Sequence, residues 1–475
     1  MADDKRTIHL VSLGCPKNRV DSEVMLGVAM DRGYLHVDDP EDADVIVVNT
    51  CGFIDPAKKE SVDTILEMAD FRADGRCDKL VVAGCLSQRH PDEMARELPE
   101  VDHFLGSSDM LKLGDVLRGG AERVLVGQPA DWVIAAENPR AVSSRPGSAY
   151  LKIAEGCNRK CAFCVIPSLR GKQRSRSIDD VVREAERLVA SGVKELNLIS
   201  QDTVSYGRDT KQGGLAQLVE RVADVEGVHW VRLFYLYPEK LDDALVDLLA
   251  DHPRVLPYVD MPLQHAADGM LRRMRRGHGG QRLYDLVERL RGRVTDLTFR
   301  TAFIVGHPGE TDAEFEELLE FVSWARFDRV GVFRYSDEEG SHAAELEGKV
   351  DEQTAETRYH QLMEMARQIA SENNAQLVDR ELEVIVEGQS DEHDLVLMGR
   401  HRGQAPSIDG QVYLSGTEYL ERQPVAGDMV KVRVNQSSDY DIAGEIIDWL
   451  DTAPAVRPVA NVRLRVLPSD HRDVT

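Results

Sequence analysis

Short apolar runs, separated by stretches whose apolar positions recur with helical spacing, make up the first third of the chain. The apolar runs predict strands at Thr7–Leu13, Asp44–Asn49, Lys79–Ala83 and Arg123–Val126. Stretches such as Val20–Met30 and Pro56–Ala69 predict helices between them. Strands that alternate with helices indicate a parallel sheet covered on both faces. We therefore expect an open α/β domain over residues 1–137.

The next segment repeats a strand and an amphipathic helix about six times. Its strands are predicted near Ala149–Ala154, Glu195–Ser200, Trp230–Tyr235, Tyr258–Pro262, Phe299–Val305 and Arg329–Tyr335. Six units fall short of the eight that close a full barrel. We expect a partial (βα)6 barrel, with a linker before it and a connecting helix after it, over residues 138–375. Its reactive groups should lie at the carboxyl ends of the strands.

Short alternating strands follow the connecting helix. Their even spacing and turn residues predict a small antiparallel β-barrel over residues 376–450. Residues 451–475 contain three prolines and little periodicity. We expect them to form a poorly ordered tail. The predicted fold class is therefore α/β, with a small β-barrel at the C-terminal end.

The charge and hydropathy of the chain narrow the classes of partner. The formal net charge is −25, which argues against a large nucleic-acid footprint, because phosphate binding needs clustered Lys and Arg. Such a surface suits a basic protein partner, although solubility alone explains it equally well. No run of about eighteen apolar residues predicts a membrane span, and the charged start lacks the apolar stretch of a signal peptide. We expect a cytoplasmic protein.

The strongest chemical signal is a loop with three cysteines, Cys157, Cys161 and Cys164, directly after a predicted strand. Three thiolates can hold three irons of a 4Fe-4S cluster. No fourth cysteine follows nearby, so the fourth iron would be open to another ligand. The alternative is a zinc knuckle with a distant fourth ligand. Zinc loops usually pair two C-x2-C units, and this chain has no second pair.

Three further cysteines, Cys15, Cys51 and Cys85, each follow an apolar run and each have a glycine beside them. The carboxyl ends of parallel strands meet at one edge of a sheet, so the three thiols are expected to converge there. This pattern predicts a second metal site. The alternative is three buried cysteines that act as small apolar residues. Cys77 lies in a polar stretch and receives no role.

With both cysteine sets and the small barrel, residues 6–450 resemble the methylthiotransferase family of radical S-adenosylmethionine (SAM) enzymes, whose C-terminal domain is a TRAM domain. The resemblance implies two 4Fe-4S clusters and two uses of SAM, one as methyl donor and one as radical source. Sulfur is carried at the N-terminal cluster, and no catalytic side chain is needed beyond the cluster ligands. A low-potential electron donor and a sulfur donor are implied as partners. A radical suits this chemistry, because no general base can open an unactivated C–H bond.

Four residues are candidate SAM contacts. The resemblance places Phe163 near the adenine, and Gln201 and Gln264 end strands where this fold binds its cofactor. Arg176 lies in a basic segment, Arg170–Arg176, that could pair with a carboxylate of SAM or of the substrate, or could be a solvated turn. His307 stands where the family commonly has an aromatic residue, and we assign it no role.

Several motifs resemble the branch of the family that modifies an aspartate β-carbon in the twelfth small-subunit ribosomal protein. They are Ser12–Asn18 with Val20–Glu23, Ile199–Thr203, Tyr235–Pro238 and Tyr258–His265. The sister branch modifies a tRNA adenosine and typically has Gln-Met where Pro16 and Lys17 stand. Acidic residues outnumber basic ones between residues 376 and 450, and this would repel tRNA and attract a basic protein. Two alternatives remain: the tRNA enzyme, and a non-catalytic iron–sulfur sensor or ribosome-binding factor, for which an open iron would serve no purpose.

Overall fold

In the computed structural model, which describes residues 5–129, 132–390, 396–417, 420–451, 462 and 464–467, the first apolar runs form a parallel sheet. Its strands, in the spatial order β2-β1-β3-β4-β5-β6, are β1 (Thr7–Leu13), β2 (Leu35–His36), β3 (Val45–Thr50), β4 (Lys79–Gly84), β5 (His103–Leu105) and β6 (Val124–Leu125). Its helices are α1 (Pro16–Met30), α2 (Asp55–Asp74), α3 (Cys85–Arg89), α4 (Pro91–Glu97) and α5 (Leu113–Arg118). Alternate side chains of β1, β3 and β4 belong to two separate hydrophobic cores, because helices cover both faces of the sheet.

A short strand from the end of the chain joins this sheet. β20 (Arg465–Leu467) pairs in parallel with Val11–Leu13 of β1. β2 pairs only with Thr7 and Ile8, which leaves the backbone groups at the far end of that edge of β1 available for pairing. The expectation of a poorly ordered tail is therefore wrong for residues 465–467. Apart from Asp451, Val462 and residues 464–467, the predicted tail lies outside the described residues.

The central segment forms a six-stranded parallel sheet whose strands stand in sequence order, as expected for a partial barrel. The strands are β7 (Ser148–Lys152), β10 (Glu195–Ile199), β11 (Trp230–Leu233), β12 (Val255–Asp260), β13 (Thr298–Val305) and β14 (Arg329–Arg334). The helices are α6 (Ile166–Arg170), α7 (Ile178–Ala190), α8 (Leu215–Ala223), α9 (Asp243–Asp251), α10 (Asp268–Arg273), α11 (Gly280–Arg293), α12 (Asp312–Ala325) and α13 (Glu352–Ala375). β8 (Ala154–Glu155) and β9 (Arg174–Ser175) form a separate antiparallel pair that flanks the cysteine loop.

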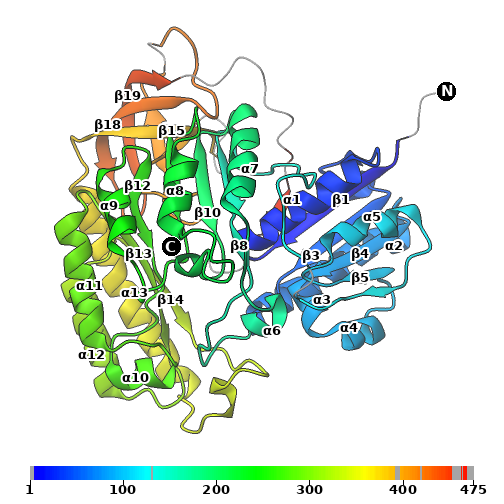
Figure 1. Ribbon diagram of the computed structural model, residues 1–475, viewed down its shortest axis with the longest axis horizontal. Helices are drawn as coiled ribbons and strands as arrows, with labels where there is room; N and C mark the ends of the chain where they lie inside the picture. Colours follow the sequence, from blue (N-terminus) through cyan, green and yellow to red (C-terminus); the bar gives the residue numbers. More distant parts are fainter. Residues whose placement is uncertain are drawn as a thin grey trace.

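The inner face of the partial barrel is filled by other parts of the chain. Val20, Val24 and Val28 of α1 share a hydrophobic core with inward-facing residues such as Phe234 and Tyr258. Ala405 and Met429 of the C-terminal domain belong to the same core. Figure 1 shows α1 lying between the N-terminal sheet and the strands of the barrel. The first helix therefore belongs structurally to two domains.

The C-terminal domain is a closed five-stranded barrel with the strand order β15-β16-β17-β19-β18. The strands are β15 (Glu381–Gln389), β16 (Leu397–His401), β17 (Val412–Ser415), β18 (Met429–Ser437) and β19 (Ile442–Asp451). One pair, β17 with β19, is parallel, so the barrel is not wholly antiparallel. The predicted fold class is confirmed. In the described part of the chain, no helix has the length and apolar character needed to cross a bilayer.

Candidate functional site

Cys15, Cys51 and Cys85 leave the N-terminal sheet at the same edge. Ser12, Asn49 and Ala83 are aligned across the neighbouring strands β1, β3 and β4, and each cysteine lies one or two residues after the end of its strand. Gly14 is packed so closely that a Cβ there would lie 3.1 Å from the Cys51 Sγ. The structure therefore brings the three predicted cysteines together.

The three thiols affect one another electrostatically. Burial, together with the neighbouring Cys85 and Cys15, raises the pKa of the Cys51 thiol to about 12. Burial would also raise the pKa of Cys15, but Lys17, Arg170 and the backbone N–H groups at the start of α1 lower it below its ordinary value. Three thiolates in one buried space need positive charge to neutralise them. An iron–sulfur cluster fits this set of donors.

The loop that carries Cys157, Cys161 and Cys164 lies between β8 and α6. Backbone N–H groups of Arg159 and Ile166 donate to the sulfurs of Cys157 and Cys164 at 3.4 and 3.5 Å. The guanidinium of Arg276 donates to the Cys161 Sγ at 3.3 Å. Burial raises the pKa of Cys164 to about 12, and the other two thiols of the loop contribute. Hydrogen bonds to sulfur and converging thiols are what a cluster site requires.

All seven cysteines are free of disulfides. Cys77 precedes β4 and is buried in one of the two apolar cores that cover the N-terminal sheet. Among the described residues, no group of three His, Cys, Asp or Glu side chains is arranged to hold a metal ion. A single ion needs its ligands around one point. In a cluster each thiolate binds its own iron, so the sulfurs stand farther apart.

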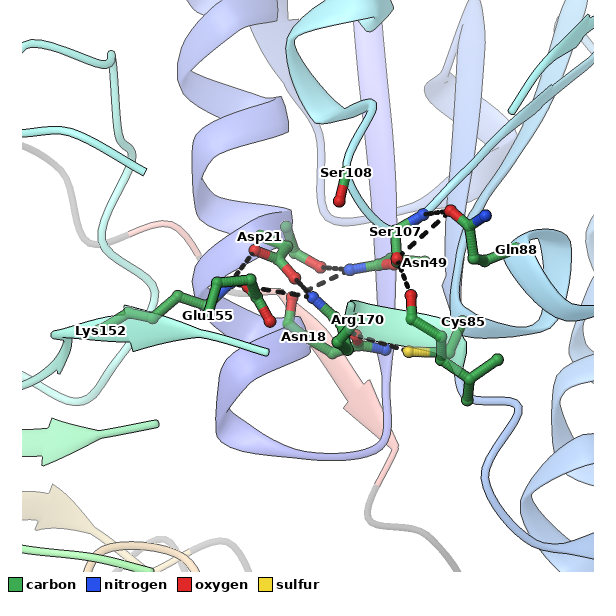
Figure 2. Close-up of polar contacts among 12 residues, drawn as sticks. Asn18, Asp21, Asn49, Cys85, Gln88, Ser107, Ser108, Lys152, Glu155 and Arg170 are labelled. Atoms are coloured by element: carbon green, nitrogen blue, oxygen red, sulfur yellow. Dashed lines mark hydrogen bonds and ion pairs between the residues drawn. The ribbon is translucent and has the colours of Figure 1, made fainter. Parts of the chain in front are cut away.

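A buried charge network lies between the two cysteine sets, and Figure 2 shows it together with Cys85 of the N-terminal set. Arg170 ends α6, which begins two residues after Cys164, and its guanidinium lies 2.7 Å from Asp21 of α1. It also donates to the Asn18 side chain, which in turn donates to the backbone carbonyls of Leu13 and Thr50 at 3.0 and 2.8 Å. The helix behind one cysteine loop is therefore bound to the residues that order the strand ends of the other set.

Lys152 completes this network. Its ammonium lies 2.6 Å from Asp21 and also pairs with Glu155. Glu155 accepts a hydrogen bond from Gln201 at 2.5 Å. Burial opposes ionisation of Glu155, but Lys152 and Arg170 lower its pKa to about 2. Two cations and two carboxylates therefore share the space between the N-terminal domain and the barrel.

The four predicted SAM contacts differ in their surroundings. Phe163 packs against a small apolar cluster of Ala267, Met270 and Met274. Gln264 follows β12 with a φ of +73° and exchanges backbone hydrogen bonds with β13. Gln201 is bonded to Glu155, as described above. The guanidinium of Arg176 is buried and pairs with Asp180 and Glu184 of α7, so its interactions are within the fold.

The sequence analysis did not single out Arg159, which lies within the loop of Cys157, Cys161 and Cys164, or Arg276, which lies beside that loop. Arg159 lies over the Tyr237 ring at 3.6 Å from its centroid and pairs with Asp202 at 2.6 Å. Arg276 lies over the same ring at 4.0 Å. The signals in the sequence were the position of Arg159 between Cys157 and Cys161 and, for Arg276, the basic run Arg272–Arg276 after the fourth barrel strand. His307 contacts Tyr335 edge-on, and burial lowers its pKa to about 4.

Comparison with family models divides the chain into three matched segments. Residues 7–106 match "Uncharacterized protein family UPF0004", residues 151–322 match "Radical SAM superfamily", and residues 378–447 match "TRAM domain". These segments cover most of the N-terminal sheet, of the partial barrel and of the small closed barrel, while β6 and β14 lie outside them.

Curated relatives match nearly the whole chain. One from Sorangium cellulosum, named ribosomal protein uS12 methylthiotransferase RimO, is 66% identical and covers 98% of this chain and 99% of its own length. One of the same name from Myxococcus xanthus is 48% identical, covering 94% and 93%. Among solved structures, the radical SAM methyltransferase TsrM from Kitasatospora setae has a TM-score of 0.51 at 17% identity, covering 70% of this chain and 75% of its own. That likeness concerns the fold alone.

Proposed function

The chain belongs to the RimO family of ribosomal protein uS12 methylthiotransferases, which are radical SAM enzymes, and from that premise we propose the following reaction. The substrate is an aspartate of the small-subunit ribosomal protein uS12. A methylthio group replaces one hydrogen on its β-carbon. Ribosomal proteins are made and assembled in the cytoplasm, so the reaction takes place there.

Six cysteines hold the cofactors in this proposal. Cys157, Cys161 and Cys164 hold a 4Fe-4S cluster with one open iron, and Cys15, Cys51 and Cys85 hold a second cluster. When bound, the first cluster and SAM supply a radical able to take an unactivated hydrogen, and the second carries the sulfur and methyl group. The chain then needs two SAM molecules, a low-potential electron donor and a sulfur donor.

The residues around the clusters position and shield them. Arg276 and two backbone N–H groups hydrogen-bond the sulfurs of the first set. The Asn18 side chain hydrogen-bonds the ends of β1 and β3, which precede Cys15 and Cys51. Arg170 and Lys152 hold α1 against the barrel through Asp21, so buried ion pairs connect the elements that carry the two sets. This joining of two cysteine triads through a buried network is the observation that carries the proposal.

An anaerobic assay tests the function. Reconstituted protein, SAM and a strong reductant are mixed with uS12 or with unmodified tRNA, and products are analysed by mass spectrometry. We expect a methylthio-sized mass gain that maps to one aspartate of uS12. A gain on tRNA alone would overturn the substrate assignment. The absence of deoxyadenosine with every substrate would overturn the radical mechanism.

A further inference from the structure

Lys17 is a buried cation at the junction of the N-terminal domain and the barrel. It lies in the first turn of α1, two residues after Cys15, and only 8% of its surface is exposed. Its ammonium lies 3.2 Å from the centroid of the Tyr235 ring. Tyr235 follows β11, at the carboxyl edge of the barrel where this fold places its chemistry. Lys17 therefore reaches from one candidate cluster site to the reactive edge of the barrel.

The Lys17 ammonium contacts an aromatic ring and forms no ion pair in the part of the chain that the structure describes. No described carboxylate lies within ion-pair distance of it, and it lies over the Tyr235 ring. The other buried cations here differ, since Lys152 and Arg170 each pair with two carboxylates. A cation–π contact compensates only part of the cost of taking an ammonium out of water.

Cys15 and Asp260 are the acids that attract the Lys17 ammonium most. Asp260 is already engaged, because one of its oxygens accepts from Arg300 at 2.6 Å. The other oxygen accepts the backbone N–H of Tyr235 at 2.9 Å. These bonds hold Tyr235, whose φ is +57°, in place beneath the ammonium. The cation is therefore positioned by its surroundings and left available for a further anion.

We infer that Lys17 binds the carboxylate of the substrate aspartate and selects for it. An aspartate side chain is an anion at neutral pH, and it must lose water to reach a buried site, so it needs a fixed cation there. The carboxylate carbon is bonded to the β-carbon, so holding the carboxylate also holds the carbon that reacts. This inference rests on the proposed function, because a tRNA adenosine offers no carboxylate.

A different role for Lys17 makes a different prediction. If the ammonium only neutralises the thiolates near Cys15, its loss would remove the second cluster and would affect every substrate alike. If it binds the substrate carboxylate, its loss would leave the cluster in place and would affect only substrates that carry that charge. The two roles can be distinguished by changing Lys17 in the enzyme and the target aspartate in uS12, separately and together.

The experiment pairs two forms of uS12 with four forms of the enzyme. The target aspartate, identified by mass mapping, is kept or replaced by asparagine. The enzymes, loaded with clusters and SAM but without reductant, are the native chain, Lys17→Gln, Lys17→Arg and a control, Lys59→Gln, which removes an exposed lysine of α2 in the same domain. Binding of uS12 is measured by titration, and iron content is measured in each protein.

The native chain should bind the aspartate form about 10- to 100-fold more tightly than the asparagine form, as expected for one hydrogen-bonded charge pair. Lys17→Gln should lose that preference by weakening only the aspartate form, while its iron content stays native. Lys17→Arg should keep part of the preference, and Lys59→Gln all of it. The inference is overturned if Lys17→Gln keeps the native preference, weakens both forms equally or loses half the iron. If the native chain modifies tRNA but never uS12, the proposed function fails and this inference fails with it.

Discussion

Arg170 of α6 and Asp21 of α1 form an ion pair of 2.7 Å in which both side chains are buried. Arg170 lies six residues after Cys164, and Asp21 lies six residues after Cys15. The pair therefore connects the last cysteine of one set to the first cysteine of the other. The same α1 fills the inner face of the barrel through its valines. The contact therefore helps to position one cysteine set relative to the other.

Replacing Asp21 with Asn should destabilise the protein strongly. Among the described residues, Lys152 and Arg170 would then share Glu155 as their one remaining carboxylate. Removing one partner from a buried charge network typically costs about 3–5 kcal/mol. Urea unfolding of Asp21→Asn and the native chain would measure the difference. The control is Asp78→Asn, which breaks an exposed pair with Arg6 and should change the unfolding free energy by about 0.5 kcal/mol or less. Equal effects of the two variants would contradict the role given to the buried pair.

Measurements of iron content should show that the two cysteine sets bind separate clusters. Replacing Cys15, Cys51 and Cys85 together with Ala should remove about half of the reconstituted iron and leave deoxyadenosine formation from SAM intact, because the radical SAM loop is untouched. Replacing Cys157, Cys161 and Cys164 should also halve the iron, and it should abolish deoxyadenosine. Cys77→Ala should retain all of the iron, since Cys77 packs in a separate core. Loss of all iron from either triple variant would mean that the sets do not bind separate clusters.

The sequence predicted the strands and the cysteines at their ends, because both are local patterns. It could not show that α1 packs inside the partial barrel. The valines of α1 are equally compatible with packing in the core of the N-terminal domain. It also left the basic segment Arg170–Arg176 open between cofactor binding and a solvated turn. Arg170 and Arg176 are instead buried in ion pairs with acids far away in the sequence. Such pairings depend on tertiary contacts that no local pattern records.

The acidic excess of the C-terminal barrel was also partly misread. Glu387 and Asp428 are buried and pair with Arg400 and Arg422. Asp409 accepts a hydrogen bond from Tyr258 of the partial barrel. These carboxylates hold the fold together and do not contribute to a surface for a basic partner. The number of charged residues in a sequence overstates the charge at the protein surface, because the fold buries some of those residues.

Arg276 should raise the reduction potential of the radical SAM cluster. Its N–H donates to the Cys161 Sγ at 3.3 Å, and a donor to sulfur favours the more negative, reduced cluster. Arg276→Met should lower the potential by roughly 20–60 mV, which corresponds to about 0.5–1.5 kcal/mol of hydrogen-bond energy. A redox titration followed by electron paramagnetic resonance would measure it. Arg272→Met, which removes an exposed arginine of α10, should leave the potential unchanged. A shift of equal size in both variants would point to net charge alone.

Glu195 should make the attachment of the C-terminal barrel sensitive to acid. Its carboxylate pairs with Arg400 of β16 at 2.5 Å and with Arg232 of β11 at 2.9 Å. Burial opposes its ionisation, but the two arginines lower its pKa from an ordinary 4.5 to about 2. A lowered pKa means that the stability from Glu195 is fully present above about pH 5 and is lost as pH falls from 4.5 towards 2.

Glu195→Gln isolates this contribution. The variant should be less stable than the native chain at pH 7 by about 3 kcal/mol, and the gap should narrow as pH falls below 4.5. Unfolding temperatures of both proteins at pH 7, 4.5 and 3.5 would measure the gap. Glu226→Gln, at an exposed position before β11, should stay close to the native chain throughout. A gap that is constant across pH would show that packing, not charge, is lost.

A side chain at Gly84 should be destabilising for two reasons: the backbone conformation of Gly84 is unfavourable for other residues, and neighbouring atoms leave no space for a Cβ. Its φ is +100° and its ψ is −154°, a region that other residues avoid. A Cβ there would lie 2.4 Å from the Asn49 Oδ1 and 2.5 Å from the Thr50 carbonyl oxygen. Those atoms belong to the end of β3, directly before Cys51. The added carbon would therefore push apart the strand ends that carry Cys51 and Cys85.

Gly119 provides a matched control. It has a φ of +85° and a ψ of 157°, and a Cβ there would meet nothing within 4 Å. Gly119→Ala should therefore cost only the backbone strain, about 1–3 kcal/mol. Gly84→Ala should cost that amount plus about 1–3 kcal/mol for overpacking, and it should also reduce the iron bound by the N-terminal set. Urea unfolding and iron content of both variants would measure these effects. If the two variants lose equal stability and keep equal iron, then the close approach at Gly84 does not position the cysteines, and their convergence must depend on Asn18 and Arg170 alone.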